Sequence, residues 1–178
     1  MISTTSSTTL TKNYVCKVQL IKRTKLASVI DRIESILQIK PVSLSMPLEI
    51  NVRKFSSQYD LVRLTFEKVH GVLLSKYLKE ATPDQIEKIT NLLLETVENW
   101  CKNFKFIHGD ISPGNILVTC HNSPILIDWL LDIESFTGTP RYSSSEVIGG
   151  HHSFESDRFA VLKIIEEIQV IYHQKLVF

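Results

Sequence analysis

The chain has 178 residues, which is enough for one ordinary domain or two small lobes with a sizeable hydrophobic core. An apolar fraction of 43% with 22% charged residues is unlike the composition of disordered chains, so we expect the chain to fold. Twenty basic and nineteen acidic residues leave a net charge of +1, which excludes a global field that would recruit nucleic acid or an anionic membrane.

The cysteines indicate a reducing setting. Cys16, Cys101 and Cys120 are odd in number and far apart, and they lack metal-ligand spacing, so we expect an intracellular, cytoplasmic protein. Residues 1–9 lack the basic and apolar regions of a secretory signal, and no apolar run approaches the roughly 18 residues of a membrane span. We interpret residues 1–12 as a disordered, Ser/Thr-rich lead-in.

Strand and helix periodicities alternate over the first seventy residues. Residues 14–21 alternate β-branched and aromatic with polar side chains, as a strand does. A helix should follow, because apolar residues recur at helical spacing from Leu26 to Leu37. Residues 48–55 and 59–69 predict two further strands joined by a hairpin-like connection.

The second part of the chain predicts mainly helices. Thr82 to Gln85 combine a cap residue, a first-turn proline and a glutamine three positions on, so a helix should run from there to about Cys101. The loop "HGDISPGN" and two short apolar runs follow. The last helix should cover about residues 156–173, with one apolar stripe formed by Phe159, Leu162, Ile165 and Ile168.

Three residues have the chemistry that phosphoryl transfer requires. The reaction needs a carboxylate near the acceptor hydroxyl and oxygen ligands that hold Mg²⁺ on the phosphates. Asp110 and Asn115 lie in the "HGDISPGN" loop, and Asp128 ends the second apolar run after it. If the two runs pair antiparallel about a turn at His121 and Asn122, positions 115 and 128 face each other across the open end of the hairpin. The sequence therefore predicts that Asn115 and Asp128 meet as two ligands of one metal site.

These motifs resemble the protein-kinase-like superfamily. "HGDISPGNILV" followed by "LIDW" is similar to its catalytic loop and metal-binding strand. "GTPRYSSSE" resembles the end of an activation loop, "SDRFAVLKII" the helix that anchors the catalytic loop, and "FEKVHGVLLSKYL" the hinge. The resemblance implies that Asp110 orients the acceptor hydroxyl, that Asn115 and Asp128 bind Mg²⁺, and that Asp157 braces the loop backbone.

The same resemblance assigns a nucleotide site to the first part of the chain. Phe66 would be the gatekeeper, and Glu67 and Val69 would offer backbone groups to adenine. Lys17 would pair with Glu34 and hold the phosphates of ATP, although a lone Lys and Glu are also the ordinary residues of any strand or helix surface. For His108 we expect a buried, structural role.

The sequence also departs from the family pattern. No glycine-rich phosphate loop precedes the strand that carries Lys17, because residues 1–16 contain no glycine. "HGD" lacks the usual arginine, Ser112 stands where a phosphate-stabilising lysine is usual, and "DWL" replaces the usual Asp-Phe-Gly. These changes predict weak activity and no control through a phosphorylated activation loop.

We therefore expect an α+β, protein-kinase-like fold. Residues 13–69 would form a reduced N-lobe of about three strands and one helix, and residues 70–178 a shortened, mainly helical C-lobe with the catalytic loop. The first functional hypothesis is an ATP–Mg-dependent kinase that phosphorylates Ser or Thr of a protein substrate. The alternatives are a catalytically weak or inactive kinase-like protein that regulates a kinase partner, and a small-molecule kinase of the aminoglycoside or choline phosphotransferase type.

Overall fold

The computed structural model describes residues 6–41, 43–133 and 138–176, without the side chains of 171 and 173–176. The chain divides into two compact units. The N-terminal unit comprises residues 1–40 and 45–69, and the C-terminal unit comprises residues 41–44 and 70–178. Helices and a small antiparallel sheet coexist, so the predicted α+β class is confirmed.

The N-terminal unit is built on an antiparallel sheet in the order β1-β2-β4-β3. Its strands are β1 (Ser6–Leu10), β2 (Tyr14–Lys22), β3 (Pro47–Lys54) and β4 (Tyr59–Glu67). The described part of this unit thus has four strands where the sequence predicted about three. Alternate residues of β4 are buried, which is the period expected when one face of a sheet packs on a core.

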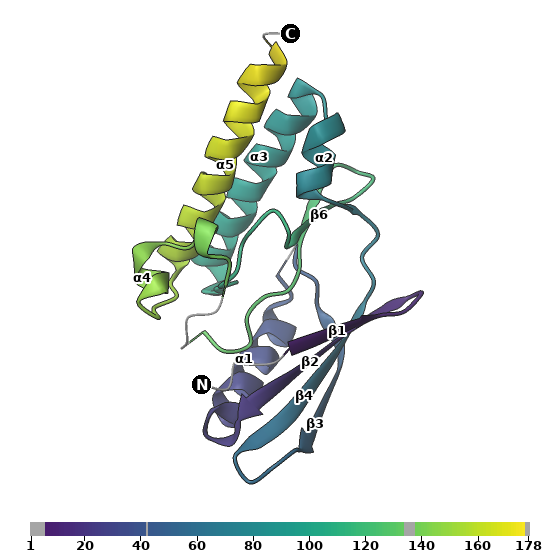
Figure 1. The fold of residues 1–178 in the computed structure, drawn as a ribbon, viewed down its shortest axis with the longest axis vertical. Coiled ribbons are helices and arrows are strands. Elements are labelled where there is room, and N and C mark those ends of the chain that lie inside the picture. The colour runs from purple at the N-terminus through teal and green to yellow at the C-terminus, as the bar shows by residue number, and fades with distance from the viewer. Residues whose placement is uncertain (1–5, 42, 134–137, 177–178) are drawn as a thin grey trace. The chain divides into compact units, whose positions relative to one another are not determined.

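Helix α1 (Leu26–Ile39) covers one face of this sheet (Figure 1). It follows a short 3-10 turn, η1 (Arg23–Lys25), and it buries Val29, Ile33 and Ile36. The helix ends where Lys40 adopts a left-handed conformation with φ of 47°.

The expected disordered lead-in over residues 1–12 is wrong for the described part of that segment. Ser6–Leu10 pairs with β2 from Val15 to Gln19. The Thr11 hydroxyl holds the turn, since it accepts a hydrogen bond from the Tyr14 N–H at 2.9 Å and donates to the Tyr14 carbonyl at 3.0 Å. Composition alone suggested disorder, whereas a neighbouring strand supplies the pairing that these residues need. Residues 1–5 lie outside the described residues.

The C-terminal unit is mainly helical. Its longest helices are α3 (Pro83–Asn99) and α5 (Phe154–Leu176), which run side by side (Figure 1). The predicted capping box of α3 is confirmed, because the Gln85 N–H donates to the Thr82 hydroxyl at 3.3 Å and the Thr82 N–H donates to the Gln85 side chain at 2.8 Å. Beyond Asn99 the chain continues as a π-helical turn, η2 (Trp100–Phe104).

Shorter elements complete this unit. Helix α2 (Leu74–Glu80), which was not predicted from the sequence, precedes α3, and α4 (Ser145–Ile148) precedes α5. A 3-10 turn, η3, covers Pro140–Tyr142. A second antiparallel sheet joins β5 (Val72–Leu73), β6 (Ile116–Val118) and β7 (Pro124–Leu126) in that order. Within the part of the chain that the structure describes, none of the helices has the length and apolarity that a membrane crossing requires.

The predicted apolar stripe of α5 is confirmed at Ile168, which is 2% exposed, and is wrong at Phe159 and Leu162, which are 43% and 39% exposed. The other buried apolar side chains in the described part of the helix are Ala160, Val161 and Ile164. Asp157 is also buried at the start of the helix and bonds to backbone groups of a loop. These bonds fix which face of α5 points inward, and they leave Phe159 and Leu162 on the outer face.

Candidate phosphoryl-transfer site

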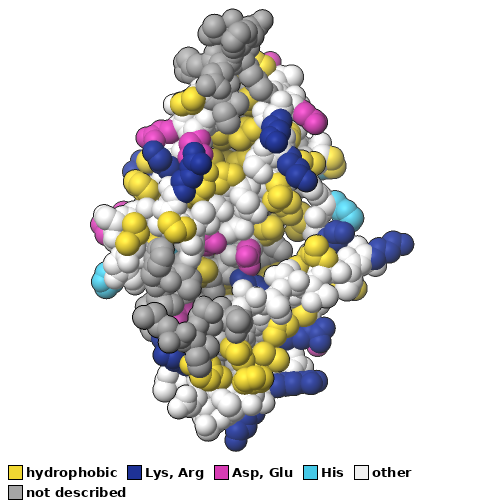
Figure 2. All heavy atoms as spheres, viewed as in Figure 1, with side chains coloured by type: hydrophobic (Ala, Val, Ile, Leu, Met, Phe, Trp, Pro, Cys, Tyr) yellow, Lys and Arg dark blue, Asp and Glu magenta, His cyan; other side chains and the backbone are white. Residues whose placement is uncertain are grey.

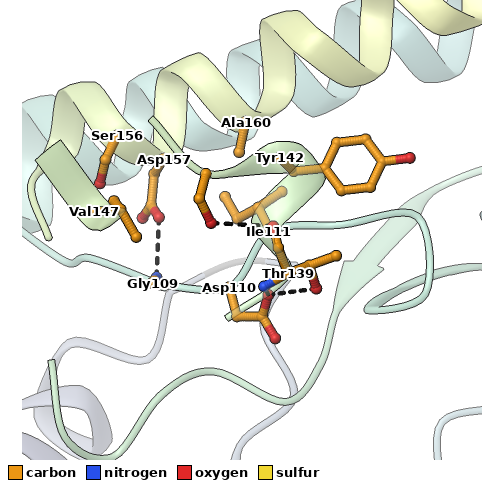
Figure 3. A pocket seen from close by; sticks show the side chains of 10 residues that line it. Gly109, Asp110, Ile111, Thr139, Tyr142, Val147, Ser156, Asp157 and Ala160 are labelled. Atoms are coloured by element: carbon orange, nitrogen blue, oxygen red, sulfur yellow. Dashed lines mark hydrogen bonds between the residues drawn. The ribbon is translucent and has the colours of Figure 1, made fainter. Parts of the chain in front are cut away.

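The N-terminus of α5 anchors the loop of residues 108–115, here called the 108–115 loop. Ser153 and Ser156 cap this helix end, since each accepts a hydrogen bond from the other's N–H through its hydroxyl. The buried Asp157 carboxylate in the first turn accepts from the N–H of His108 at 2.5 Å and of Gly109 at 2.9 Å (Figure 3). The prediction that Asp157 braces the loop backbone is therefore confirmed.

His108 connects this loop to the segment that carries Asp128. Its ring is fully buried and stacks on Trp100 with a centroid distance of 6.4 Å. Its Nδ1 accepts a hydrogen bond from the Asp110 N–H at 3.3 Å, so the proton must lie on Nε2, which donates to the Ile127 carbonyl at 3.1 Å. The Leu130 N–H donates to the His108 carbonyl at 2.9 Å. His108 thus contacts the backbone on both sides of Asp128, which agrees with the structural role expected for it.

Hydrogen bonds hold the Asp110 carboxylate through both oxygens. Oδ1 accepts from the backbone N–H and from the hydroxyl of Thr139, each at 2.9 Å (Figure 3). Oδ2 accepts from the Asn115 amide at 2.9 Å. A carboxylate offers about four acceptor positions. Three are used by these bonds, so one position on Oδ2 remains for a further donor.

Asn115 closes the 108–115 loop. Its N–H donates to the Ser112 carbonyl at 2.9 Å, and its side-chain amide donates to the carbonyl and the carboxylate of Asp110, both at 2.9 Å. Since both partners of the amide are acceptors, the side-chain nitrogen must face Asp110. The Asn115 Oδ1 atom then faces away from Asp110 and receives no hydrogen bond within the described part of the chain.

The register of the hairpin formed by β6 and β7 differs from the predicted register by one residue. Ile116 pairs with Leu126, and the Ile127 N–H donates to the Asn115 carbonyl at 2.9 Å, so Asn115 lies opposite Ile127 and not opposite Asp128. The cause is the turn. Thr119 and Ser123 close a three-residue loop in which Asn122 is left-handed with φ of 55°, whereas the prediction assumed two turn residues.

Asp128 follows directly after this extended hairpin. Its backbone is left-handed with φ of 63°, which turns the chain, and its side chain is exposed. Asp tolerates this conformation better than most residues. The hairpin therefore places Asp128 directly after Ile127, the residue that lies opposite Asn115.

The Leu130 side chain lies where a side chain on residue 109 would need space. Gly109 has a φ of 87°, and a Cβ built on it would lie 2.9 Å from the Cδ1 atom of Leu130. The absent arginine of "HGD" and the absent glycine of "DWL" were predicted as separate departures from the family. In the structure the two departures are connected. Leu130 replaces the usual glycine, and its side chain occupies the space beside residue 109, where Gly109 replaces the usual arginine.

The residues predicted for nucleotide binding all lie in the N-terminal unit. Lys17 on β2 pairs with Leu64 of β4 and with Thr8 of β1, so it shares the sheet face on which Leu64 is buried. Glu34 is exposed on α1.

The three residues proposed for the adenine side lie at the end of this unit. Phe66 is buried near the end of β4, and Glu67 is exposed at its last position. Val69 is half-buried and ends the N-terminal unit. Their predicted roles remain predictions.

Two contacts of the site were not predicted from the sequence. Thr139 donates twice to Asp110, which is 29 positions away. Tyr142 donates from its hydroxyl to Glu167 at 2.9 Å, and burial together with this contact raises the pKa of the phenol. A pairing between residues so far apart leaves no periodic signal in one sequence, so only the "GTPRY" motif pointed to this segment.

The oxygen ligands at this site fit magnesium held partly by phosphates. Among the described residues, no group of three or more His, Cys, Asp or Glu side chains gathers as a metal cage would require. Mg²⁺ is usually bound through one or two protein oxygens together with substrate phosphates and water. The Oδ1 atom of Asn115 and the exposed carboxylate of Asp128 are oxygen atoms of the type that Mg²⁺ prefers, and their predicted role as ligands remains a prediction.

Comparison with known proteins shows which proteins the chain is similar to. A family model described as the RIO domain matches residues 59–134, a range that includes the 108–115 loop and Asp128. Mitogen-activated protein kinase kinase 5 of Leishmania mexicana is 28% identical over 120 residues, which cover 61% of this chain and 23% of that protein. Both matches are to proteins of the protein-kinase-like superfamily, so the matched part of the chain is similar to that superfamily.

The fold of the chain agrees with that similarity. A small antiparallel sheet with one helix and a mainly helical unit form a reduced kinase-like fold. The RIO domain is an atypical member of the kinase-like, ATP-binding phosphotransferases, so this is the class to which the matched segment is related. The chain spans about a quarter of the length of this curated relative, with 23% of that protein covered.

Proposed function

We propose that this chain is an ATP–Mg-dependent phosphotransferase that acts on a Ser or Thr hydroxyl of a protein. The observation that carries the proposal is the set of hydrogen bonds that the Asp110 carboxylate accepts. Thr139 and Asn115 occupy three of its four acceptor positions, and the remaining position on Oδ2 is available to an acceptor hydroxyl. Asp110 would then orient that hydroxyl and accept its proton.

The other site residues would hold the nucleotide and its metal. When bound, ATP supplies the phosphoryl group and Mg²⁺ neutralises charge on the phosphates. The Oδ1 atom of Asn115 and the carboxylate of Asp128 would be the metal ligands. In the N-terminal unit, Lys17 with Glu34 would bind phosphates, and Phe66, Glu67 and Val69 would contact adenine.

The contact between Thr139 and Asp110 favours a protein acceptor over a small alcohol. The segment from Thr139 to Tyr142 lies against the 108–115 loop through both hydrogen bonds of Thr139, and so it forms a protein surface beside the acceptor carboxylate. A small-molecule kinase needs no such surface for its acceptor. We also propose a cytoplasmic location, on the basis of three cysteines that are all free thiols.

Nucleotide binding is the first test. Thermal unfolding should be recorded with and without ATP–Mg, since a ligand that binds only the folded state raises the unfolding temperature. We expect a rise for the wild type and a smaller rise for Asp128→Asn, because asparagine keeps the left-handed backbone but loses the charge. The control is Asp84→Asn, an exposed first-turn carboxylate of α3. No rise in the wild type contradicts the proposal.

Transfer is the second test. Labelled phosphate from ATP should appear on a generic protein acceptor in preference to a panel of small alcohols, and Asp110→Asn should abolish this transfer. Labelling of the alcohols alone would favour the small-molecule kinase.

A second candidate is a kinase-like protein that regulates a partner without catalysis. It is favoured by apolar side chains on the outside of the C-terminal unit. Ile148 of α4 is 60% exposed, and Val170 of α5 is 59% exposed, in addition to Phe159 and Leu162. Exposed apolar patches often mark protein interfaces. Nucleotide binding without any transfer would support this candidate.

A further inference from the structure

Strand β3 is an open edge of the sheet in the N-terminal unit. In the order β1-β2-β4-β3 it pairs with β4 on one side, and no strand adjoins its other side among the residues that the structure describes (Figure 1). The stretch from Leu48 to Arg53 contains no proline, so each of its residues keeps a backbone N–H. An edge of this kind presents backbone donors and acceptors to a further strand.

The regular part of β3 runs from Glu49 to Lys54. A bulge interrupts the pairing with β4 between Pro47 and Glu49, and beyond it the register with β4 is continuous. A bulge bends the strand and disturbs the ladder of hydrogen bonds. A further strand would therefore pair regularly with the residues from Glu49 onward.

The two faces of β3 differ in chemistry. Ile50 and Val52 lie opposite buried residues of β4, so they share the face of the sheet that α1 covers. Glu49, Asn51 and Arg53 lie on the other face, and all three are exposed. The outer face of the edge thus carries one acidic and one basic side chain, each two positions from a central asparagine.

These charges are self-complementary. When two copies of β3 pair antiparallel about a twofold axis at Asn51, Glu49 of each copy lies directly opposite Arg53 of the other. On the opposite face, Ile50 of each copy then lies opposite Val52 of the other. Side chains of opposite charge in directly opposed positions stabilise a strand pair, and so do pairs of β-branched side chains. One register therefore satisfies both faces at once.

The neighbouring twofold registers lack this match. An axis at Ile50 places Glu49 opposite Asn51 and extends the pairing into the bulged segment before Glu49. An axis at Val52 places Glu49 opposite Phe55, which lies beyond the end of β3. The axis at Asn51 is thus the one that the charges and the regular part of the strand both favour.

Exposed apolar side chains accompany this edge. Leu48, Val52 and Phe55 are 61%, 40% and 64% exposed. Antiparallel pairing brings Leu48 of one copy to the same end of the strand pair as Phe55 of the other, so apolar surface would be buried at both ends. Figure 2 shows hydrophobic side chains exposed among Lys and Arg side chains over the sheet of this unit.

We propose that β3 pairs with β3 of a second copy of this chain, antiparallel and centred on Asn51. The two sheets of four strands become one continuous sheet, with α1 of both copies on the same face. One short strand pair buries less surface than a standard interface, so monomer and dimer are in an equilibrium that depends on concentration. This inference is independent of the proposed function, because it requires neither nucleotide nor acceptor.

Charge reversal at the two opposed positions tests the register. Sedimentation velocity of the full chain over a wide range of concentrations should show the wild type passing from monomer to dimer. Glu49→Arg leaves arginine opposite arginine, and Arg53→Glu leaves glutamate opposite glutamate, so each variant alone should dimerise about tenfold more weakly or worse. An equal mixture of the two variants should recover dimerisation, because every opposed pair again has opposite charges. The control is Lys12→Glu, an exposed charge reversal in the turn between β1 and β2.

A disulfide at the twofold axis tests the same register without changing either charge. Directly opposed residues in an antiparallel pair have Cα atoms about 4.5–5.5 Å apart, which a disulfide can span. In a Cys120→Ser background, which removes the exposed native thiol, Asn51→Cys should form a covalent dimer under mild oxidation. The control is Lys54→Cys at the end of β3, where an offset of six residues separates the two copies by about 20 Å.

Three results would overturn the inference. They are a wild type that stays monomeric or forms larger assemblies, a mixture of Glu49→Arg and Arg53→Glu that associates no better than either variant alone, and equal crosslinking of Asn51→Cys and Lys54→Cys. Thermal unfolding of each variant checks its fold. If a charge variant fails to fold, the crosslink at Asn51, which keeps both charges, decides the register.

Discussion

Leu130 fills the space that a side chain on Gly109 would need. The Cδ1 atom of Leu130 is 2.9 Å from the position of a Cβ on residue 109, and the Leu130 N–H donates to the neighbouring His108 carbonyl at 2.9 Å. The 108–115 loop and the segment after Asp128 are therefore coupled by shape and by a backbone hydrogen bond. Any larger residue at 109 must displace Leu130 or the loop.

Gly109→Ala should destabilise the C-terminal unit. We expect a loss of about 1–3 kcal/mol in the free energy of unfolding, because a non-glycine residue is strained at a φ of 87° and also meets Leu130. Urea titration followed by tryptophan fluorescence measures the loss. Leu130→Ala should recover part of it in the double variant, since this change removes the steric contact but not the backbone strain.

The control for this substitution is Gly114→Ala in the same loop. There the atom nearest to an added Cβ, the Ser112 hydroxyl oxygen, is 3.8 Å away, so no comparable loss is expected. Equal losses at positions 109 and 114 would contradict the explanation.

Asp157→Asn should loosen the 108–115 loop. The buried carboxylate accepts two backbone N–H groups, whereas an amide can accept through only one atom and would turn a donor toward the other N–H. We expect a loss of about 2 kcal/mol or more in the free energy of unfolding. Hydrogen exchange should become faster at the amides of His108 and Gly109. Glu155→Gln, an exposed change in the same helix turn, should leave both measurements unchanged.

Thr139→Val should slow phosphoryl transfer more than it alters stability. Valine keeps the backbone N–H bond to Asp110 but removes the hydroxyl bond of 2.9 Å, so the carboxylate loses one of its fixed contacts. Loss of a hydrogen bond to a charged group raises the free energy of activation enough to slow the reaction about tenfold or more. Thr139→Ser keeps the hydroxyl and should retain the rate. A valine variant as fast as the serine variant would show that Thr139 does not position Asp110.

The sequence predicted most of the long elements but not how distant segments meet. The capping box of α3 was predictable because its signals lie within four residues. The register at Asn115 was not, because a three-residue turn ending in a left-handed Asn122 differs from a two-residue turn by one position and leaves no other trace in the sequence. The inward face of α5 depends on Asp157 and its loop partners, and periodicity alone placed Phe159 and Leu162 on that face together with Ile168.

Asp60 gives the N-terminal unit a dependence on pH that can be measured. Its buried carboxylate accepts from the Arg23 guanidinium at 3.0 and 3.1 Å, and this hydrogen bonding, opposed by desolvation, lowers the pKa of Asp60. Since the pKa is lower in the folded than in the unfolded state, the stabilisation is present above the unfolded value of about 4 and is lost as pH falls through the folded value. Asp60→Asn should therefore lower the unfolding temperature at pH 7, and its difference from the wild type should shrink below about pH 4. Asp31→Asn, an exposed change on α1, is the control. A difference between wild type and Asp60→Asn that stays constant from pH 7 to pH 2 would show that the Arg23 contact does not contribute through the charge of Asp60.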